Sequence, residues 1–360
     1  MTLSEILIRG LNISEFRGIR ELEKTLNFGM FNVLIGRNNV GKSSILEALY
    51  LLTMPYRSSS ECIQPYCERN KNFLTSRITP VDFIGEMHDG VHSLVYGYAG
   101  RGVLKYILNR PITVLFPRQS ETIRVKDIII EITRTGTSNV MAGNVKLRVE
   151  DYRSLLETLG VDMERNILCH YIPNDSDAFR KIASFVLNDA VWDWIEKYGI
   201  HRRVIDDILS PAVYDKFTEV TIKRDTLCVR KEVNEHIGPL YIGVNSLGEG
   251  VKRIILAYLS VEYLDPKIVL WDDIEVAAHP SLVEAILKWL AKSKRQVFIS
   301  THSIDVLYSL VHIHPKDCNI IVLRKSGKDV VQYRIMAIDK IEELLEGGID
   351  PRKIIEELRL

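Results

Sequence analysis

The segment Phe31–Leu52, which reads FNVLIGRNNVGKSSILEALYLL, constrains the fold of this chain more than any other segment. Its first residues, Phe31–Ile35, are mostly apolar and predict a buried strand. The next residues, Gly36–Ser43, fit the pattern G-x-x-x-x-G-K-[ST], and apolar residues at helical spacing follow them. A strand, a glycine loop and a helix N-terminus form the context that a phosphate-binding P-loop requires. The alternative is a plain glycine-containing turn, which the strand-to-helix context disfavours.

The residue types of this loop suit a nucleoside triphosphate. Gly36 and Gly41 allow the backbone to wrap a phosphate without Cβ clashes. We expect Lys42 to reach the β- and γ-phosphates and the Ser43 hydroxyl to bind Mg²⁺. The N–H groups of the loop and of the first helical turn would face the phosphate oxygens; the residues concerned are Gly36, Arg37, Asn38, Asn39, Val40, Gly41, Lys42, Ser43 and Ser44.

Composition limits the remaining classes of protein. The chain has 360 residues, which suffices for one large domain or two, and 46% of them are hydrophobic. Its formal net charge is zero, so no overall basic field indicates a nucleic-acid binder. Glu5 and Arg9 interrupt the first apolar stretch, which disfavours a signal peptide, and no apolar run is long enough to cross a bilayer. We therefore expect a cytoplasmic protein without membrane association.

Hydrophobic patterns predict a β-rich first half, helices from residue 151 to 211, and alternating strands and helices from residue 244 onward. The alternation predicts a parallel α/β sheet. The segment Pro55–Pro80 reads as a loop, and Asp151 as a helix cap. The predicted strands are Ile6–Leu11, Ile13–Phe16, Leu22–Leu26, Phe31–Ile35, Ser93–Tyr98, Val103–Leu108, Ile112–Phe116, Thr122–Thr133, Asn144–Val149, Val220–Ile222, Thr226–Val233, Lys267–Trp271, Gln296–Ser300, Asn319–Leu323 and Val330–Ile335. The predicted helices are Asp151–Leu159, Asp177–Tyr198, His201–Leu209, Ser246–Tyr263, Ser281–Lys292, Ile338–Leu345 and Pro351–Leu358.

A second motif, Ile268–Asp273, places four apolar residues before two acids and matches the Walker B pattern. An acid at the carboxyl end of a strand beside the P-loop can hold Mg²⁺ through water. Without the P-loop, a core strand followed by an Asp-rich turn would explain this segment equally well.

A third motif, Gln296–Ser303, is a buried strand that ends in Ser-Thr-His-Ser. His302 would then stand at the ligand-binding edge of an open α/β sheet, within reach of a γ-phosphate. Taken alone, a helix-capping cluster with an incidental histidine is the simpler interpretation.

A fourth motif, Asn245–Gly250, reads NSLGEG and opens an amphipathic helix. A serine and two glycines before a helix can form another anion-binding N-terminus. A plain N-cap at Ser246 is the simpler interpretation of this segment alone. The order P-loop, long insertion, Ser-x-Gly-Glu-Gly, Walker B and Ser-Thr-His is more specific than any single motif.

With these motifs in this order, the sequence resembles the ABC-type ATPase heads of the structural-maintenance-of-chromosomes (SMC) and RecF-like recombination-mediator group. It is most similar to the OLD (overcoming lysogenization defect) subgroup of AAA-like ATPases, the AAA_15 and AAA_21 types. The segment Ile13–Ile19 resembles the F-R-G-I strand of that group, and Asp272–Pro280 resembles its D-E-x-E-x-x-x-H-P stretch. The resemblance covers residues 1–54 and 200–310.

The resemblance implies an α/β P-loop NTPase fold, with a parallel core sheet, an antiparallel β lobe and a helical insertion. It divides the chain into a first ATPase lobe (1–150), a helical insertion (151–215), a second ATPase lobe (216–325) and a C-terminal strand with helices (326–360). Long coiled-coil arms are missing from the pattern. The 58 residues after His302 are too few for a TOPRIM nuclease domain, so any nuclease effector would be a separate chain.

The resemblance also implies roles for single residues. ATP and Mg²⁺ would bind between two protomers of a homodimer, with Asp272 positioning the Mg²⁺ and His302 acting as the switch histidine. Lys42 and Asp273 would complete the catalytic residues. The signature residues Ser246, Gly248 and Glu249 would close the site of the other protomer, and Arg17 and Arg37 would add phosphate contacts.

Three departures from the family pattern bear on the activity. Asp273 replaces the usual glutamate and places its carboxylate about 1.5 Å farther from an attacking water. Hydrolysis is then expected to be slow, unless Glu275 or water compensates. Leu247 fills a position that is usually small, and Val276–Ala278 differs from the family's Asn-Gly-Leu at the dimer interface.

Three functions remain open at this point. The first is an ATPase that dimerises around ATP and drives a partner in DNA repair or defence, and the second is an ATP-dependent dimerisation switch with little turnover. The third is direct DNA binding, although solvated strand faces explain the basic residues as well; these are Arg118, Arg124, Lys126, Arg134, Lys146, Arg148, Arg202, Arg203, Lys223, Arg224, Arg230 and Lys231. A transporter ATPase is disfavoured, because the signature is not LSGGQ and the insertion is long.

Overall fold

The computed structural model describes residues 6–56, 80–116, 121–162, 166–233 and 238–354. A parallel sheet forms its centre, in the order β15 (Cys318–Lys325), β4 (Phe31–Ile35), β14 (Gln296–Thr301), β13 (Ile268–Trp271) and β9 (Cys169–Ile172). Every residue of β4, β14, β13 and β9 is buried. Strands that are buried on both faces read as continuous apolar runs, which explains why three of these four were visible in the sequence.

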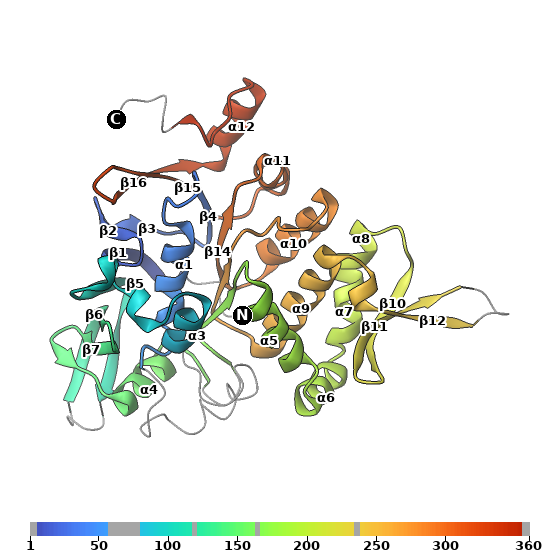
Figure 1. The fold of residues 1–360 in the computed structure, drawn as a ribbon, viewed down its shortest axis with the longest axis horizontal. Coiled ribbons are helices and arrows are strands. Elements are labelled where there is room, and N and C mark those ends of the chain that lie inside the picture. The colour runs from blue at the N-terminus through green and yellow to red at the C-terminus, as the bar shows by residue number, and fades with distance from the viewer. Residues whose placement is uncertain (1–5, 57–79, 117–120, 163–165, 234–237, 355–360) are drawn as a thin grey trace.

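An antiparallel region extends this sheet on the β15 side (Figure 1). β16 (Val330–Ala337) pairs antiparallel with β15 and parallel with β2, and the order continues through β1, β5, β6, β7 and β8. The bounds are β1 (Ile8–Phe16), β2 (Ile19–Leu22), β3 (Leu26–Asn27, paired with β1), β5 (Gly102–Phe116), β6 (Glu121–Thr133), β7 (Gly136–Ala142) and β8 (Val145–Lys146).

Helices cover the central sheet and carry the motifs. α1 (Lys42–Leu51) packs against β9, β13 and β14, and α9 (Glu249–Leu264) packs against β9. The remaining elements near the sheet are α3 (Pro80–Met87), the 3-10 helices η1 (Val91–Leu94) and η2 (Tyr96–Tyr98), α4 (Val149–Thr158), α10 (Pro280–Lys292), α11 (Ile304–Ile313) and α12 (Ile338–Glu346). Among the described residues, no helix combines the length and the apolar character needed to span a membrane.

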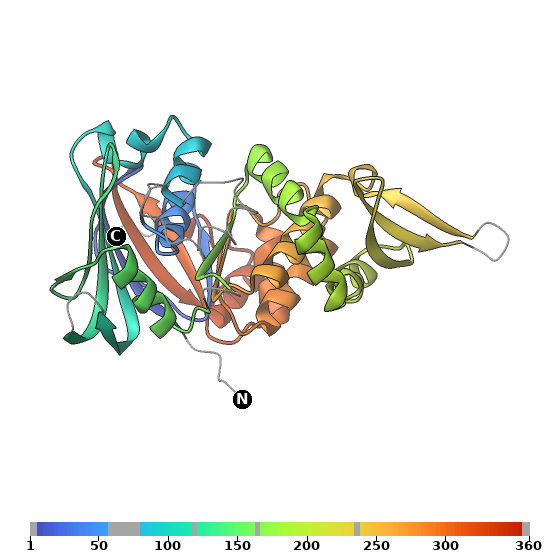
Figure 2. The same cartoon turned by 90° about the horizontal axis from the view of Figure 1, so that it is seen from below.

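A helical region with a small antiparallel sheet lies at the end of the molecule opposite β6 and β7 (Figures 1 and 2). Its three strands, ordered β10–β11–β12, project away from the helices. The elements are α5 (Ser176–Val186), α6 (Asp189–Lys197), α7 (Ile200–Val204), the π-helical turn η3 (Ile205–Leu209), α8 (Ser210–Ala212), β10 (Phe217–Lys223), β11 (Thr226–Glu232), β12 (Pro239–Gly243) and the 3-10 turn η4 (Val244–Ser246).

The mixed α/β fold with a parallel core and an antiparallel region confirms the predicted fold class, but several predicted elements are wrong. Ser93–Tyr98 forms 3-10 turns instead of a strand, because Gly97 takes a left-handed conformation with φ 60°. The expected single helix Asp177–Tyr198 is two helices, and Asn188 caps the second of them. Asp151 lies at the third helical position of α4, where its carboxylate accepts from the Arg148 N–H.

Other elements were not predicted at all. β9 interrupts the region that was expected to be helical, and β7, β12, α3 and α11 have no counterpart among the predictions. Of the expected loop Pro55–Pro80, residues 57–79 lie outside the described residues. Of the expected helix Pro351–Leu358, residues 355–358 lie outside them, and Pro351–Lys353 form a turn.

Candidate functional site

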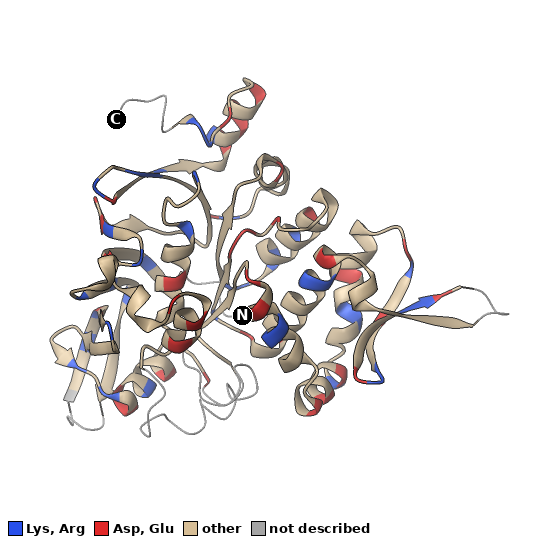
Figure 3. Cartoon of the chain, in the orientation of Figure 1, with Lys and Arg blue, Asp and Glu red and all other residues tan. Residues whose placement is uncertain are grey.

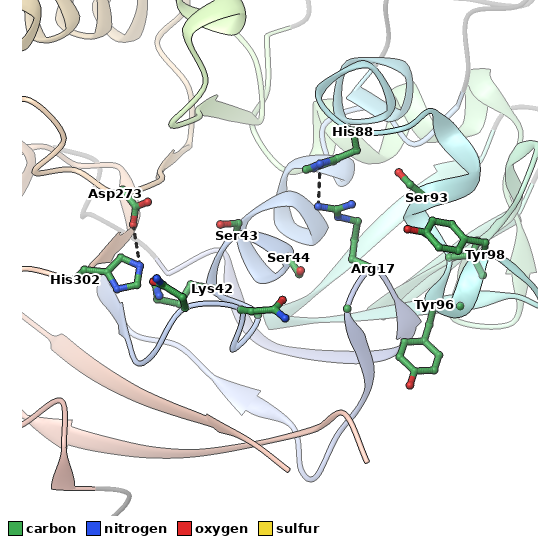
Figure 4. Close-up of a pocket in the computed structure, with 16 residues that line it drawn as sticks. Arg17, Lys42, Ser43, Ser44, His88, Ser93, Tyr96, Tyr98, Asp273 and His302 are labelled. Atoms are coloured by element: carbon green, nitrogen blue, oxygen red, sulfur yellow. Dashed lines mark hydrogen bonds and ion pairs between the residues drawn. The ribbon is translucent and has the colours of Figure 1, made fainter. Parts of the chain in front are cut away.

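The carboxyl ends of β4, β13 and β14 meet at one edge of the central sheet, because the three strands are parallel and in register. A pocket of about 610 Å³ opens there (Figure 4). Asp273 and His302 lie at one end, Tyr96 and Tyr98 at the other, and the P-loop between them. The lining residues are Arg17, Gly18, Asn38, Asn39, Gly41, Lys42, Ser43, Ser44, His88, Ser93, Val95, Tyr96, Gly97, Tyr98, Asp273 and His302.

The P-loop is packed closely against β15. Gly36 has φ 147°, and a Cβ there would stand 2.6 Å from the carbonyl oxygen of Leu323. Only glycine fits this position. The Lys42 ammonium donates to the carbonyls of Gly36 and Arg37, both at 3.1 Å. Burial lowers the pKa of Lys42, while the carboxylates of Asp273, Asp272 and Glu275 act in the opposite direction.

Asp272 lies at the end of β13 and is only 6% exposed. Burial raises the pKa of Asp272 to about 6, because its charged form is poorly solvated. Hydrogen bonds from the hydroxyls of Ser300 and Ser43 act against this shift. Asp272 and Ser43 therefore lie side by side, as the Walker B and P-loop motifs predicted.

Asp273 turns its side chain towards the pocket from a left-handed backbone conformation with φ 45°. Its N–H donates to the Ser300 hydroxyl at 2.8 Å, and Asn174 Nδ2 donates to its carboxylate at 3.1 Å. Its Oδ1 lies 3.6 Å from Nε2 of His302 (Figure 4). A non-glycine residue in this conformation is uncommon and is often found where a structure holds a functional group in place.

Glu275 lies beneath His302. One carboxylate oxygen, Oε1, accepts the His302 N–H at 2.6 Å. The other, Oε2, is buried and has no hydrogen-bond partner within the described part of the chain. Glu275 therefore holds the main chain of His302 and does not line the pocket.

Arg17 enters the pocket from the turn between β1 and β2, with φ 53°. Its Nε donates to Glu47 at 2.8 Å and its Nη2 to Nδ1 of His88 at 3.1 Å, while the other His88 nitrogen lies 2.8 Å from Glu47. Sequence reasoning found Arg17 through the Phe-Arg-Gly-Ile segment. It missed His88 and Glu47, which carry no motif.

The aromatic end of the pocket was also missed. The N–H of Arg17 donates to the Leu94 carbonyl, and Phe16 forms a β-bridge with Val95, so the 3-10 turns are attached to β1. The Tyr96 hydroxyl donates to Asp329 at 2.7 Å. Tyr96 and Tyr98 were predicted to lie on a strand, and that error removed them from the candidate residues.

The signature residues lie apart from this pocket. Ser246 ends η4, Gly248 has φ 90°, and Glu249 begins α9; none of the three lines the pocket that contains Lys42. The next residue, Gly250, packs against the 276–278 segment, where a Cβ would stand 2.1 Å from the Ala277 carbonyl oxygen. The chain therefore brings Lys42, Ser43, Asp272, Asp273 and His302 together, and leaves the signature on a separate surface.

The P-loop residues Val40 and Arg37 both lie outside the pocket that contains Lys42. Val40 is buried against the core. Arg37 lines a neighbouring pocket of about 500 Å³ on the outer side of the loop, together with Arg324, Lys325 and Arg352.

The donor set at the end of β13 fits Mg²⁺. The Ser43 hydroxyl and the Asp272 carboxylate are adjacent hard oxygen ligands, and a cation would offset the cost of ionising a buried acid. Within the described residues, no group of three His, Cys, Asp or Glu side chains is arranged to hold a metal ion. Mg²⁺ in nucleotide sites commonly takes its other ligands from phosphates and water.

Known proteins resemble this chain in fold and in part of its sequence. An SMC head bound to the C-winged helix domain of ScpA matches 94% of the chain and 100% of that protein, with a TM-score of 0.59 and 11% identity. The SMC head with an extended coiled coil, bound to the C-terminal domain of ScpA derived from Pyrococcus furiosus, matches 95% and 99%, with a TM-score of 0.59 and 9% identity. At these identities the likeness establishes the fold alone.

One curated protein is similar over a short segment. The uncharacterized protein MJECL10 of Methanocaldococcus jannaschii is 53% identical over 47 residues, which are 13% of this chain and 21% of that protein. The chain thus covers about a fifth of the length of this relative.

Two family models match successive parts of the chain up to residue 308. Residues 7–84 match the model described as "AAA ATPase domain". Residues 91–308, more than half of the chain, match the model described as "AAA domain, putative AbiEii toxin, Type IV TA system". The chain therefore belongs to this AAA-domain family, and its fold is that of an SMC head.

Proposed function

We propose that this ATPase binds ATP with Mg²⁺ in the 610 Å³ pocket and hydrolyses it with Lys42, Asp273 and His302. The observation that carries the proposal is the meeting of four chain segments at one sheet edge: the P-loop, Asp272–Asp273, His302 and Arg17. Ligands of open α/β sheets bind at the carboxyl ends of the strands. Tyr96 and Tyr98 line the end of the pocket opposite Asp273 and His302. Aromatic side chains at that end suit the nucleoside part of ATP, while the phosphates would lie at the P-loop.

The phosphates would lie over the P-loop and the start of α1. The free N–H groups of a helix N-terminus favour negative charge. On binding, Lys42 would exchange the carbonyls of Gly36 and Arg37 for oxygens of the β- and γ-phosphates. Arg17, which Glu47 and His88 hold in place, would add a second cation on the other side of Ser44.

Ser43 and Asp272 would hold the Mg²⁺, which neutralises charge on the β- and γ-phosphates when it is bound. Asp273 would orient a water and accept its proton as the water oxygen bonds to the γ-phosphorus. The bond from the γ-phosphorus to the β–γ bridging oxygen would break, and ADP and inorganic phosphate would leave. His302 would donate a hydrogen bond to the γ-phosphate. The 3.6 Å between Nε2 of His302 and Oδ1 of Asp273 lets both side chains face the same water.

A second protomer would complete the site. Ser246, Gly248 and Glu249 lie at the exposed start of α9 and outside their own pocket, so they can reach a phosphate only in another chain. The proposed active form is therefore a homodimer with ATP between its protomers.

The simplest test of the activity is phosphate release from ATP with and without Mg²⁺. We expect steady turnover with Mg²⁺, and a fall of at least about a hundredfold when a chelator removes it, because the γ-phosphate charge is then not neutralised. Addition of Mg²⁺ to the chelated sample should restore the rate. Equal rates with and without the metal would contradict the role of Ser43 and Asp272.

A second candidate function is an ATP-dependent switch with little turnover, which the short Asp273 side chain favours. The variant Asp273→Glu lengthens this side chain by one methylene, about 1.5 Å, and should bring the carboxylate closer to the attacking water. We expect its ATP turnover to rise by about tenfold over the wild type. The variant Asp305→Glu, at the exposed start of α11, serves as the control. An unchanged or lower rate in Asp273→Glu would show that aspartate already suits this site.

We also propose that the ATPase drives or gates an effector in a separate chain, in DNA repair or defence. The matched family description names a toxin of a toxin–antitoxin system, which supports the defence role. Direct DNA binding has less support. Arg202, Arg203, Arg230 and Lys231 form ion pairs with carboxylates, and Figure 3 shows basic and acidic residues interspersed along the chain. Copurification with the wild-type protein tests this proposal, which predicts that a nuclease or another effector is recovered as a separate chain.

A further inference from the structure

Charged side chains hold the main chain of His302 from both sides. Its N–H donates to Oε1 of Glu275 at 2.6 Å, and its carbonyl accepts from Nη1 of Arg352 at 2.5 Å. His302 lies between the end of β14 at Thr301 and Ser303, the N-cap of α11. Its carbonyl therefore lies outside both elements and depends on Arg352 for its hydrogen bond.

The guanidinium of Arg352 is itself fixed in orientation. Its Nε and Nη2 donate to the two carboxylate oxygens of Asp350 at 2.9 and 2.7 Å, which leaves Nη1 for His302. A two-point contact of this kind sets the plane of the guanidinium as well as its position.

The segment that carries Arg352 is anchored in the core. Pro351 and Ile354 are buried, and Asp350 accepts the N–H of Arg352 with its side chain and that of Lys353 with its carbonyl. α12, which precedes this segment, packs against β15, β16 and α11. Packing and a tight turn, rather than a mobile surface side chain, therefore place Arg352 at His302.

We propose that Arg352 is a positioning residue, through which the C-terminal segment 350–354 sets the direction of the His302 imidazole at the γ-phosphate. This inference rests on the proposed function, which assigns the imidazole its role in hydrolysis. The backbone of His302 fixes the point from which its side chain starts, and Nε2 of the imidazole lies 3.6 Å from Oδ1 of Asp273. A shift of about 1 Å in a reacting group can cost about a hundredfold in rate.

The location of Arg352 predicts which kinetic parameter will change. Arg352 does not line the pocket proposed for ATP; it lies in the neighbouring pocket with Arg37. Loss of its side chain should therefore lower kcat and leave ATP affinity nearly unchanged, because only the geometry of the chemical step is disturbed.

The test compares Arg352→Ala, Arg352→Lys and the control Lys353→Ala, an exposed neighbour of the same charge. For Arg352→Ala we expect kcat to fall about tenfold or more and KM for ATP to stay within about twofold of the wild type. The kcat of Arg352→Lys should lie between those of Arg352→Ala and the wild type. The lysine keeps the positive charge, but its single ammonium cannot bind Asp350 and the His302 carbonyl in the fixed plane of a guanidinium. Lys353→Ala should match the wild type.

Thermal unfolding and temperature-dependent rates separate positioning from stability. A fall in kcat that disappears at a temperature where all variants are folded would overturn the proposal, as would a rise in KM with kcat unchanged. The wild type distinguishes a failure of the proposed function from a failure of the role proposed for Arg352. Absence of ATP turnover in the wild type contradicts the proposed function, whereas turnover that Arg352→Ala retains in full contradicts only the role of Arg352.

Discussion

Lys42→Ala is expected to reduce ATP turnover by at least about two to three orders of magnitude, because the variant loses the cation that faces the transferred phosphoryl group. The Lys42 ammonium already lies inside the P-loop, held at 3.1 Å by two loop carbonyls and surrounded by the carboxylates of Asp272, Asp273 and Glu275. The phosphates of ATP would take the place of those carbonyls. The measurement is steady-state phosphate release at saturating ATP.

Lys328→Ala removes an ammonium from an exposed turn between β15 and β16 and serves as the matched control. Its turnover should equal that of the wild type. Thermal unfolding of both variants shows whether the P-loop tolerates the loss of the buried lysine. A folded Lys42→Ala protein with wild-type turnover would place the hydrolytic site elsewhere in the chain.

The P-loop end of the pocket could be predicted from sequence because its parts are local. In β4, the P-loop and α1, strand, loop and helix follow one another without interruption, so a single motif describes all of them. Asp272 and His302 each follow a buried strand, and parallel pairing of β13, β14 and β4 brings those strand ends together. The topology of a parallel sheet thus converts two separate sequence positions into neighbours.

The rest of the pocket depends on contacts that no local pattern encodes. Residues 93–98 contain the branched and aromatic residues typical of a strand. The left-handed Gly97 and the attachment of Leu94 and Val95 to β1 instead turn the segment into the aromatic end of the pocket. His88 reaches Glu47 and Arg17 from the turn after α3, and Arg352 reaches His302 across 50 residues. In each case, long-range packing decides a position that propensity and spacing leave undetermined.

β9 was missed for a related reason. It has only four residues, Cys169–Ile172, between two helical stretches, which is too short to show a period. Its pairing with β13 makes it part of the central sheet and brings the Tyr171 hydroxyl 3.4 Å from Asp272. The strand thus contributes to the surroundings of the Walker B acid, although its own sequence carries no motif.

The proposed sharing of the site between two protomers leads to the second prediction with a large effect. Ser246 is exposed at the start of α9, so Ser246→Glu should fold normally. In the proposed homodimer it would place a carboxylate against the γ-phosphate of the other protomer, and like charges at that distance repel strongly. We expect Ser246→Glu alone to lower ATP turnover by more than about tenfold. Thr158→Glu, which adds the same charge to the exposed end of α4, should have no effect.

A mixture of Lys42→Ala and Ser246→Glu then tests whether two chains share one site. A mixed dimer has one site in which both residues are altered and one in which both are wild type. Random pairing at equal concentrations makes about half of the dimers mixed, so turnover should recover to about a quarter of the wild-type rate. If the mixture hydrolyses ATP no faster than the two variants measured separately, Lys42 and Ser246 do not act across an interface, and the signature segment must serve its own chain or another partner.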